Sequence, residues 1–448
     1  MAKLRLNFIS AFNERVEPLM QGVVQAEAIE IVPTYSHPSE TFLRQLKDME
    51  FPVGEMSMSS YLIARERGLD MIALPVFPSR RLFHTELSYH TGSGIEKPQD
   101  ILGKRIGVSE YQQTAALWQR GILDHDFGVS QYKVQWYMEC TEDMSHGGVT
   151  GFTPPAGISF HRVPPNKSLA SMLVHNELDV AAINSPWKNA PNQLGRSHKI
   201  TGADGDWSKV KMLFADRMVE GKRFFDKWGF LPVNHAYTIR GDIYRKHPWV
   251  AFNLYSAFVK AKEHFNAKLV ESIPSELFFG KNYLAKTQEM FGSDPFPYGV
   301  KANRKLLETL VDFSHEQGLI TRKPKIEELF AESTRDYAII TSDTEGAITS
   351  WNRGAERIFG YTENEALGRN LDIIWLPEDV AAGAPAEQRR QAREEGRAEE
   401  ERWHIRKGGA RIFCSGMLTP LQTNEFVGYA TILRDVTGRR QAGHDGAS

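Results

Sequence analysis

Along the first 330 residues, short apolar runs break into polar residues and are followed by stretches whose apolar positions recur with helical spacing. The pattern predicts strands at 4–10, 52–57, 71–77, 104–110, 132–137, 179–183 and 234–240. Helices are predicted at 39–49, 60–68, 114–123, 168–178 and 248–265. This alternation is typical of an α/β protein with an open, mostly parallel sheet and helices on both faces. The Gly- and Pro-rich segment 141–157 is predicted to be a loop.

The pattern changes near residues 331–335. From Asp336 onward, a strand, a turn and a second strand precede short helices, and further strands are predicted at 401–409, 410–421 and 426–436. This order predicts a small antiparallel α+β domain. The mixed-charge run 387–402 is predicted to be a solvated helix. The expected division of the chain is 1–332 for the α/β part, 333–439 for the α+β domain and 440–448 for a disordered tail.

Length and composition narrow the class of protein. A chain of 448 residues is too long for one ordinary core, so we expect two or three domains. The formal net charge of -2 indicates no nucleic-acid partner, and no apolar run is long enough to span a membrane. The N-terminus lacks the apolar segment of a secretion signal. Because Cys140 and Cys414 are the only cysteines, we expect a cytoplasmic protein without structural disulfides.

Two predicted helices begin with hydroxyl side chains directly after a strand. Ser59 and Ser60 follow the strand at 52–57, and Thr114 follows the strand at 104–110, each where an N-cap is expected. A helix N-terminus presents free N–H groups and a partial positive charge, so it binds carboxylate or phosphate. Two such sites in one α/β chain suit a small ligand with two anionic groups.

Two arginines follow the strand at 71–77. Arg80 and Arg81 lie in the loop after its carboxyl end, which faces the ligand crevice in an open α/β sheet. Guanidinium groups bind carboxylates in bidentate fashion, so both arginines are candidates for a carboxylate clamp. The alternative is that they are simply solvated.

Histidines and acidic residues near predicted strand ends are candidates for proton transfer. His84 and His235 each lie at a strand edge near the expected crevice, and imidazole changes charge near neutral pH. The alternative for each is a packed histidine. Glu110 is a third catalytic candidate and Tyr111 a candidate substrate contact. Glu55 and Glu110 have an alternative role, since they can hold the backbone of the helix starts through hydrogen bonds.

The sequence shows no motif for a metal or a nucleotide. There is no His-x-x-x-His pair on a predicted helix and no Cys-x-x-Cys. Gly92-Ser93-Gly94 lacks the rest of a dinucleotide fingerprint, and no nucleophile elbow is present.

Long stretches of the α/β part resemble the bacterial 4,5-dihydroxyphthalate decarboxylase family. They include EMSMSSYLIARERG, LPVFPSRRLFH, IGVSEYQQTAALWQRGIL, FGSDPFPYGVKANRKLLETL and HEQGLITRKPKIEELF. The resemblance covers about residues 3–332 and implies the type II periplasmic-binding-protein fold, in which two α/β lobes surround a cleft. Segments 141–157 and 184–195 depart from the family pattern and are expected to reshape that cleft.

The C-terminal part resembles a PAS domain over about residues 331–439. The similarity rests on Asp343-x-x-Gly346, on the run from Ile348 to Tyr361, and on the closing strand that ends in Arg434-Asp435-Val436-Thr437. The flavin-photosensor variant carries a cysteine where this chain has Leu371, so that photochemistry is excluded. The ligand of this PAS domain is unknown. His404 is expected at the surface rather than as a haem ligand.

The resemblance implies decarboxylation of 4,5-dihydroxyphthalate to protocatechuate in phthalate catabolism. Loss of the hydroxyl proton para to a carboxylate pushes electron density onto the carbon that bears this carboxylate, and protonation there allows carbon dioxide to leave. This reaction requires no cofactor. A role for a metal ion that binds the catechol oxygens stays open. The expected partner is a small aromatic dicarboxylate, and the sequence leaves open whether the chain forms a homo-oligomer.

Two other functions remain open at this point. The first is a cytoplasmic protein that binds an aromatic acid and uses the PAS domain as a relay. The second is an enzyme that acts on a related aromatic acid.

Overall fold

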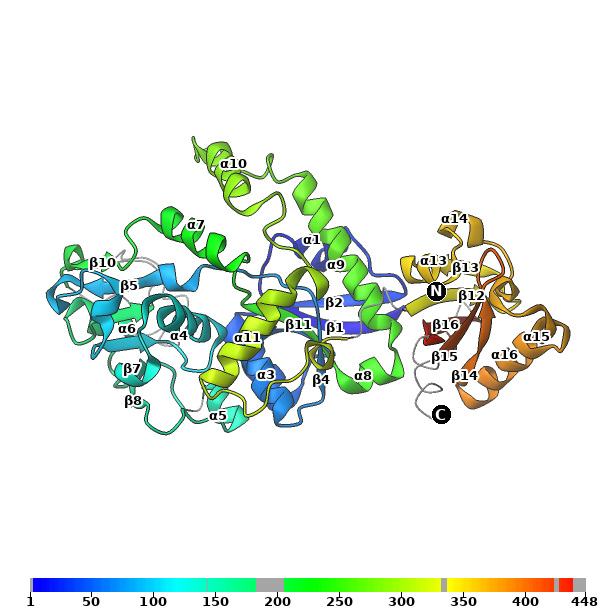
Figure 1. Ribbon diagram of the computed structural model, residues 1–448, viewed down its shortest axis with the longest axis horizontal. Helices are drawn as coiled ribbons and strands as arrows, with labels where there is room; N and C mark the ends of the chain where they lie inside the picture. Colours follow the sequence, from blue (N-terminus) through cyan, green and yellow to red (C-terminus); the bar gives the residue numbers. More distant parts are fainter. Residues whose placement is uncertain (1–2, 143, 183–204, 332–336, 423–426, 438–448) are drawn as a thin grey trace, which may run out of the picture.

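The computed structural model describes residues 3–142, 144–182, 205–331, 337–422 and 427–437, and it places them in three sheets (Figure 1). The first sheet has the strand order β2 (Ile29–Tyr35), β1 (Leu4–Ser10), β3 (Val53–Ser57), β11 (His235–Arg240) and β4 (Met71–Leu74). Strands β2, β1 and β3 run parallel, whereas β11 is antiparallel to both of its neighbours. Strand β11, which follows the second sheet in the sequence, therefore lies between β3 and β4, which precede that sheet.

The second sheet has the strand order β10 (Val210–Met212), β5 (Leu87–His90), β9 (Val180–Ala182), β6 (Arg105–Val108), β7 (Gln135–Met138) and β8 (Ser159–Arg162). Strands β9, β6, β7 and β8 are parallel, and β5 is antiparallel to β9 and β10. The chain leaves the first sheet after β4 and returns at β11, so two α/β lobes result. The two-lobed expectation is confirmed. The single sheet expected from alternation alone is wrong, because the chain crosses between lobes.

The helices of the two lobes are, in chain order, α1 (Glu17–Met20), α2 (Pro38–Asp48), α3 (Met58–Glu66), α4 (Thr114–Phe127), α5 (His146–Thr150), α6 (Leu169–Val174), α7 (Arg217–Trp228), α8 (Gly241–Lys246), α9 (Trp249–Ala267), α10 (Gly280–Phe291), α11 (Arg304–Glu316) and α12 (Ile326–Leu329). Within the described ranges, none of the helices combines the length and the apolar character needed to cross a membrane.

Helix α4 joins the two lobes. It is buried from Thr114 to Leu123. The Nε1–H of Trp118 donates to the carbonyl of Val233 (2.8 Å), in the segment that leads into β11. Gly121 lies directly against the ring of Phe313 on α11, and a Cβ there would collide with that ring. The close approach lets residues of α3, α4 and α11 share one hydrophobic core, which fixes the start of α4 relative to the first lobe.

The third sheet is antiparallel, with the order β13 (Ile348–Trp351), β12 (Tyr337–Asp343), β16 (Val427–Asp435), β15 (Arg411–Gln422) and β14 (Ala398–Ile405). Its helices are α13 (Arg353–Phe359), α14 (Glu363–Ala366), α15 (Pro377–Ala381) and α16 (Ala384–Glu395). Apolar side chains of β12 and β16 pack with those of the short helices into a separate core. The α+β expectation for this part of the chain is confirmed.

Three local expectations need correction. The segment predicted as a loop at 141–157 contains α5, whose N-cap Ser145 accepts hydrogen bonds from the backbone N–H groups that follow it. The helix predicted over 387–402 ends at Glu395, because Gly396 adopts a left-handed conformation (φ 80°) and β14 begins two residues later. His404 is fully buried rather than at the surface. Segment 184–195 and the tail 440–448 lie outside the described residues, as does the expected boundary at 332.

The third sheet packs on the first lobe through the face opposite to its own helices. Ile339 on β12 and Ile432 on β16 belong to the same buried cluster as Trp249 and Leu254 of α9. Figure 1 shows β12 and α13 next to α9, with the third sheet and its helices at one end of the molecule. The two folded parts therefore share a hydrophobic contact.

A chain of residues 1–332 should still unfold cooperatively, because its two lobes share a core of their own. Its melting temperature should be lower than that of the full chain, since removal of Ile339 and Ile432 exposes Trp249. Scanning calorimetry of both chains measures this. Aggregation or loss of the cooperative transition would show that the first part depends on the second.

Candidate functional site

The carboxyl ends of β1 and β3 meet the start of β11 at one edge of the first sheet. Parallel β1 and β3 end at Ser10 and Ser57, and antiparallel β11 begins at His235, directly opposite Ser57. In open α/β sheets, ligands bind outside the carboxyl ends of the strands. This edge also carries the N-terminus of α3, and we identify it as the candidate site.

The N-termini of α3 and α4 meet at this edge, one from each lobe. The hydroxyls of Ser57 and Thr114 are hydrogen-bonded (2.8 Å), and Thr114 Oγ1 accepts from the backbone N–H of Ser59 (3.0 Å). Ser59 Oγ donates to the carbonyl of Gln112 (2.5 Å). The structure thus brings together the two helix starts that the sequence singled out, although they are 55 residues apart.

The expected N-caps are wrong by one to three positions. The N-cap of α3 is Ser57 and that of α4 is Gln113, and neither side chain makes a capping hydrogen bond. Ser59, Ser60 and Thr114 lie in the first turns instead, where Ser59 and Thr114 bond across the two lobes. The preference of N-cap positions for Ser and Thr could not by itself identify which of several neighbouring hydroxyl residues is the cap. Ser60 Oγ is buried and makes no hydrogen bond within the described part of the chain.

His235 and Glu55 form a buried pair beside these helix starts. His235 Nδ1 lies 2.6 Å from Glu55 Oε1, and the two residues come from the adjacent antiparallel strands β11 and β3. The other carboxylate oxygen, Glu55 Oε2, accepts from the backbone N–H of Ala11 (2.9 Å) and from Ser10 Oγ (3.3 Å). His235 also packs edge-on against Phe42 of α2, with ring centroids 4.8 Å apart.

Electrostatics keep Glu55 ionised. Burial by itself would raise the pKa of Glu55, but the charge and hydrogen bond of His235, together with the donors from Ala11 and Ser10, outweigh it and leave the pKa lowered. Because a carboxylate is only an acceptor, Nδ1 of His235 must carry the hydrogen. This hydrogen bond fixes the orientation of the imidazole and leaves Nε2 as the nitrogen that can accept a proton. The arrangement is that of a histidine held by a carboxylate for proton transfer.

Acid should destabilise the wild-type chain more steeply than the Glu55→Gln variant. A carboxyl whose pKa is lowered by folding stabilises the folded state above its unfolded pKa, and this contribution is lost as the pH falls through the folded pKa. The difference should appear below about pH 4.5. Urea unfolding of both chains between pH 7 and pH 3 measures it, and parallel pH curves would contradict it.

Glu110 lies on the facing lobe, where its carboxylate accepts hydrogen bonds from neighbouring protein groups. One oxygen of Glu110 accepts from the backbone N–H of His146 (2.9 Å), and the other accepts from the side-chain amide of Gln112. His146, at the start of α5, is hydrogen-bonded through Nε2 to the carbonyl of Ser39 in α2 (3.2 Å). The geometry of Glu110 matches the alternative role of holding a helix start, and His146 connects the two lobes.

Tyr111 points away from the helix starts into the second lobe. Its hydroxyl donates to Gln131 Oε1 (2.8 Å), and the guanidinium of Arg120 lies 3.9 Å above its ring. It is 1% exposed. The structure does not bring Tyr111 to the site edge.

Arg80 and Arg81 are engaged with protein groups. The buried guanidinium of Arg80 donates to the carbonyls of Leu231 (3.0 Å) and Pro297 (2.9 Å) and to the side chain of Asn303. Burial lowers the pKa of Arg80 to about 10. Arg81 pairs with the nearly buried carboxylate of Glu86 (2.7 Å). Both terminal nitrogens of Arg80 and the Nε of Arg81 are thus engaged with protein groups, and a carboxylate clamp by either residue stays a prediction.

Arg15 and Tyr298 are residues of this edge that the sequence reasoning missed. Arg15 follows β1, donates to the carbonyl of Pro78 (2.7 Å) and lies over the ring of Phe296 (3.8 Å). The hydroxyl of Tyr298 and the Nε–H of Arg15 are buried and make no hydrogen bond with any residue that the structure describes. The rule that selected Arg80, a basic residue after a parallel strand, also selects Arg15.

His84 lies apart from the other candidates. It is fully buried, with Nε2 2.7 Å from Glu220 Oε1 and its ring against Phe224. Glu220 in turn pairs with Arg223, which reaches Asp126 in the last turn of α4. Gln119, in the middle of α4, donates to the carbonyl of the neighbouring Phe83 (3.0 Å), so His84 lies beside the middle and C-terminal half of α4 rather than at its start. Burial lowers the pKa of His84, against the opposing effect of Glu220.

The substitution His84→Gln should lower stability and leave the chemistry of the site unchanged. It removes a buried hydrogen bond to Glu220 and the packing against Phe224, at a cost of about 1–3 kcal/mol. The melting temperature and the rate of a single turnover are measured on the same preparation. A large loss of rate in a stably folded His84→Gln chain would restore His84 as a catalytic candidate.

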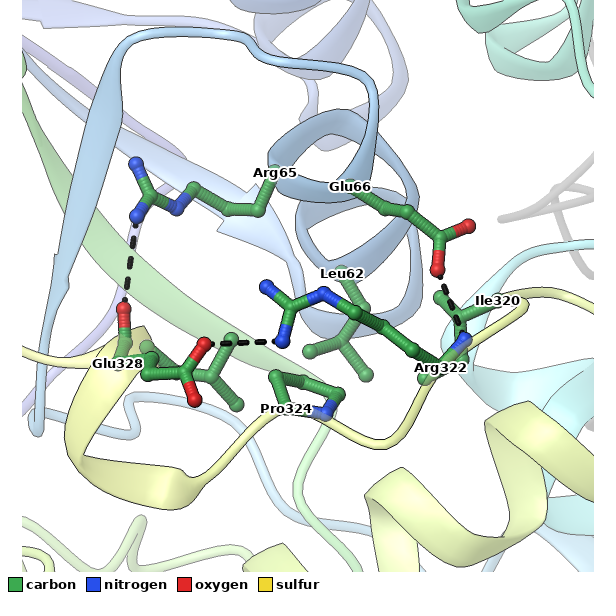
Figure 2. Close-up of a pocket in the computed structure, with 8 residues that line it drawn as sticks. Leu62, Arg65, Glu66, Ile320, Arg322, Pro324 and Glu328 are labelled. Carbon is green, nitrogen blue, oxygen red and sulfur yellow. Dashed lines mark hydrogen bonds and ion pairs between the residues drawn. The ribbon is translucent and has the colours of Figure 1, made fainter.

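The C-terminal end of α3 is held by the segment 320–329 (Figure 2). The carboxylate of Glu66 accepts from the backbone N–H groups of Thr321 (2.8 Å) and Arg322 (3.1 Å), and Arg322 pairs with Glu328 (2.9 Å). The cavity between them measures about 40 Å³, enough for water but not for an aromatic ligand. This cluster therefore anchors α3, whose other end faces α4.

Within the described ranges, no group of three or more His, Cys, Asp or Glu side chains is arranged to hold a metal ion. Both cysteines are buried free thiols.

Known proteins resemble both folded parts of the chain. The chain is 29% identical over 333 residues to 4,5-dihydroxyphthalate decarboxylase of Comamonas testosteroni, across 74% of this chain and 97% of that enzyme. It is 33% identical over 219 residues to 4,5-dihydroxyphthalate decarboxylase of Pseudomonas putida, across 47% of this chain and 83% of that enzyme. Residues 336–438 match the family model of the PAS domain. Among solved structures, the periplasmic aliphatic sulphonate binding protein SsuA of Escherichia coli aligns with 74% of this chain and 92% of its own length, at 13% identity and a TM-score of 0.41.

Proposed function

Because the chain belongs to the 4,5-dihydroxyphthalate decarboxylase family and carries a PAS domain, we propose that it is a carboxy-lyase that converts 4,5-dihydroxyphthalate to protocatechuate. The structural observation that supports this proposal is the buried pair of His235 and Glu55 beside the facing starts of α3 and α4. The pair supplies a group for proton transfer, and the helix starts supply positive potential for an anionic substrate.

The proposed chemistry begins at the hydroxyl para to the carboxylate that leaves. Nε2 of His235 takes the hydroxyl proton, and the ionised Glu55 stabilises the imidazolium that forms. The electron density moves to the ring carbon that bears the carboxylate. A proton is then added to this carbon, the bond to the carboxylate breaks with its electrons returning to the ring, and carbon dioxide leaves.

A second group is required for the ring proton, since the hydroxyl and the protonated carbon lie on opposite sides of the ring. We assign this role to His146 on the facing lobe. The rings of His146 and His235 both contact Phe42, with centroids at 5.6 Å and 4.8 Å. The substrate would then lie between one imidazole from each lobe.

The anionic groups of the substrate would be bound by the N-termini of α3 and α4 and by Arg15. The backbone N–H groups in the first turns of both helices attract a carboxylate, and Ser60 Oγ is a buried hydroxyl in the first turn of α3. Arg15 and Tyr298 add a cation and a hydroxyl at the same edge of the first sheet. We propose no cofactor for this chemistry, and a cytoplasmic location, in keeping with two free thiols.

A binding protein for an aromatic acid is the second candidate function. It is favoured by the packing of the PAS domain on α9 through Ile339 and Ile432, because this contact could relay occupancy of the cleft. The same cleft residues would then bind ligand without turnover.

Turnover in D₂O tests the proposed chemistry. Protocatechuate formed from 4,5-dihydroxyphthalate should carry one deuterium at the position that lost the carboxylate, as shown by proton NMR. Phthalate, which lacks the hydroxyls, should bind without releasing carbon dioxide. Release of carbon dioxide from phthalate at a similar rate would contradict ring protonation driven by the hydroxyl.

A further inference from the structure

A cavity of about 410 Å³ lies where the PAS domain meets the first lobe. One wall is formed by α9, with Trp249, Phe252 and Ser256. The opposite wall is formed by the PAS sheet, with Thr341 of β12 and Ala430 of β16. The volume lies in the range of 300–1,000 Å³ that is typical of small-molecule sites, and the lining does not include the residues of the candidate site at the edge of the first sheet.

The sequence of the PAS sheet explains why a space exists there. On the face that meets α9, Ile339 pairs with Ile432 across β12 and β16, and both are buried against the lobe. Two residues further along the same face, Thr341 pairs with Ala430. Because side chains alternate between faces, this smaller pair also points at α9 and leaves the gap unfilled.

The cavity is also separate from the interior of the PAS domain. Ala338, Ile340 and Leu433 alternate with the residues named above and belong to the domain's own core with its short helices. The cavity therefore lies on the outer face of the sheet, and a ligand there touches both folded parts of the chain.

The lining combines aromatic walls with an acidic rim. Trp249, Phe252 and Tyr255 of α9 supply the aromatic surface. Carboxylates come from both parts of the chain, with Glu27 and Glu263 in the first lobe and Glu363 in the PAS domain. Among the described lining residues, Lys260 supplies the basic side chain that partly offsets these carboxylates in the charge balance. Aromatic faces and an excess of carboxylates attract an organic cation and repel an anion.

We propose that this cavity binds a small organic cation with an apolar body, such as an arylalkylamine. The apolar body lies between α9 and the outer face of the PAS sheet, and the ammonium group lies at the rim formed by Glu27 and Glu363. The aromatic dicarboxylate that we propose as the substrate carries the opposite charge and is excluded from this site.

Three probes of nearly equal shape test the proposal on the full chain. 2-Phenylethylamine, 2-phenylethanol and phenylacetate differ in their charge, and titration calorimetry with tryptophan fluorescence follows their binding. The amine should bind saturably and about tenfold or more tightly than phenylacetate. The double variant Glu27→Gln with Glu363→Gln should reduce this preference severalfold.

Filled variants locate the binding. Ala430→Leu fills the cavity from the PAS sheet and Ser256→Leu fills it from α9, so that one remains informative if the other fails to fold. Ala386→Leu, on the exposed surface of α16, is the matched control. Loss of amine binding in the filled variants and its retention in Ala386→Leu support the proposal. Absence of saturable amine binding, equal affinity for all three probes, or undiminished amine binding in the filled variants would overturn it.

Discussion

The substitution His235→Gln should lower turnover of 4,5-dihydroxyphthalate roughly 10²–10⁴-fold while the chain still folds and binds the substrate. The imidazole is the group that Glu55 orients through Nδ1 at 2.6 Å, and a glutamine amide cannot take a proton from the hydroxyl at neutral pH. Its side chain can still contact Phe42 and accept or donate one hydrogen bond. The measurements are the single-turnover rate, the affinity for the substrate and the melting temperature.

His84→Gln is the matched control for this prediction. It makes the same replacement at a histidine that also pairs with a glutamate, but beside the middle and C-terminal half of α4 rather than at its start. We expect different effects from the two variants. His235→Gln should lower the single-turnover rate, and His84→Gln should lower the melting temperature. Near-normal turnover in a folded His235→Gln chain would remove His235 from the proposed chemistry.

The substitution Arg80→Ala should cost about 3 kcal/mol or more of unfolding free energy. It removes the buried donor of the Leu231 carbonyl and of the Asn303 side-chain oxygen, and it leaves the Pro297 carbonyl with the amide of Asn303 as its donor (2.9 Å). The segments before β11 and before α11 would both lose an attachment to the loop after β4. Chemical denaturation of the purified chains measures the loss.

Arg245→Ala provides the control, because its pair with Asp70 is exposed and should contribute little to the unfolding free energy. The hypothesis that Arg80 clamps a carboxylate predicts a different outcome. In that case Arg80→Ala would leave stability nearly unchanged and would weaken binding of a dicarboxylate much more than binding of a neutral catechol. Titration of both ligands, combined with the denaturation curves, distinguishes the two roles.

Most of the fold could be predicted from local patterns. The strands at 4–10 and 234–240 agree with β1 and β11, and the long helix at 248–265 agrees with α9, because these segments combine a clear period with flanking polar residues. Strands β2, β5, β8 and β10 were not predicted. Of these, β5, β8 and β10 span only three or four residues, too few to establish a period. The crossing of the chain between lobes could be inferred from resemblance but not from periodicity.

The candidate site was predicted only in part, because its pairs are distant in sequence. Both His84 and His235 were candidates because each lies near the end of a predicted strand, and the sequence pattern does not distinguish between them. Only the register of β11 with β3 brings His235 to Glu55, 180 residues away. Arg80 shows a limit of the same kind, since its position after a strand is typical of a ligand contact while its guanidinium is engaged with carbonyl groups, so its role as a carboxylate clamp stays a prediction.

The most direct test of the central claim is a single-turnover measurement on the full chain. Enzyme in slight excess over 4,5-dihydroxyphthalate is mixed at neutral pH, and carbon dioxide and protocatechuate are followed together. Both products should appear in equal amounts, up to one per substrate molecule. Saturable binding of 4,5-dihydroxyphthalate with neither product formed would contradict it and would favour a protein that binds the aromatic acid without turnover.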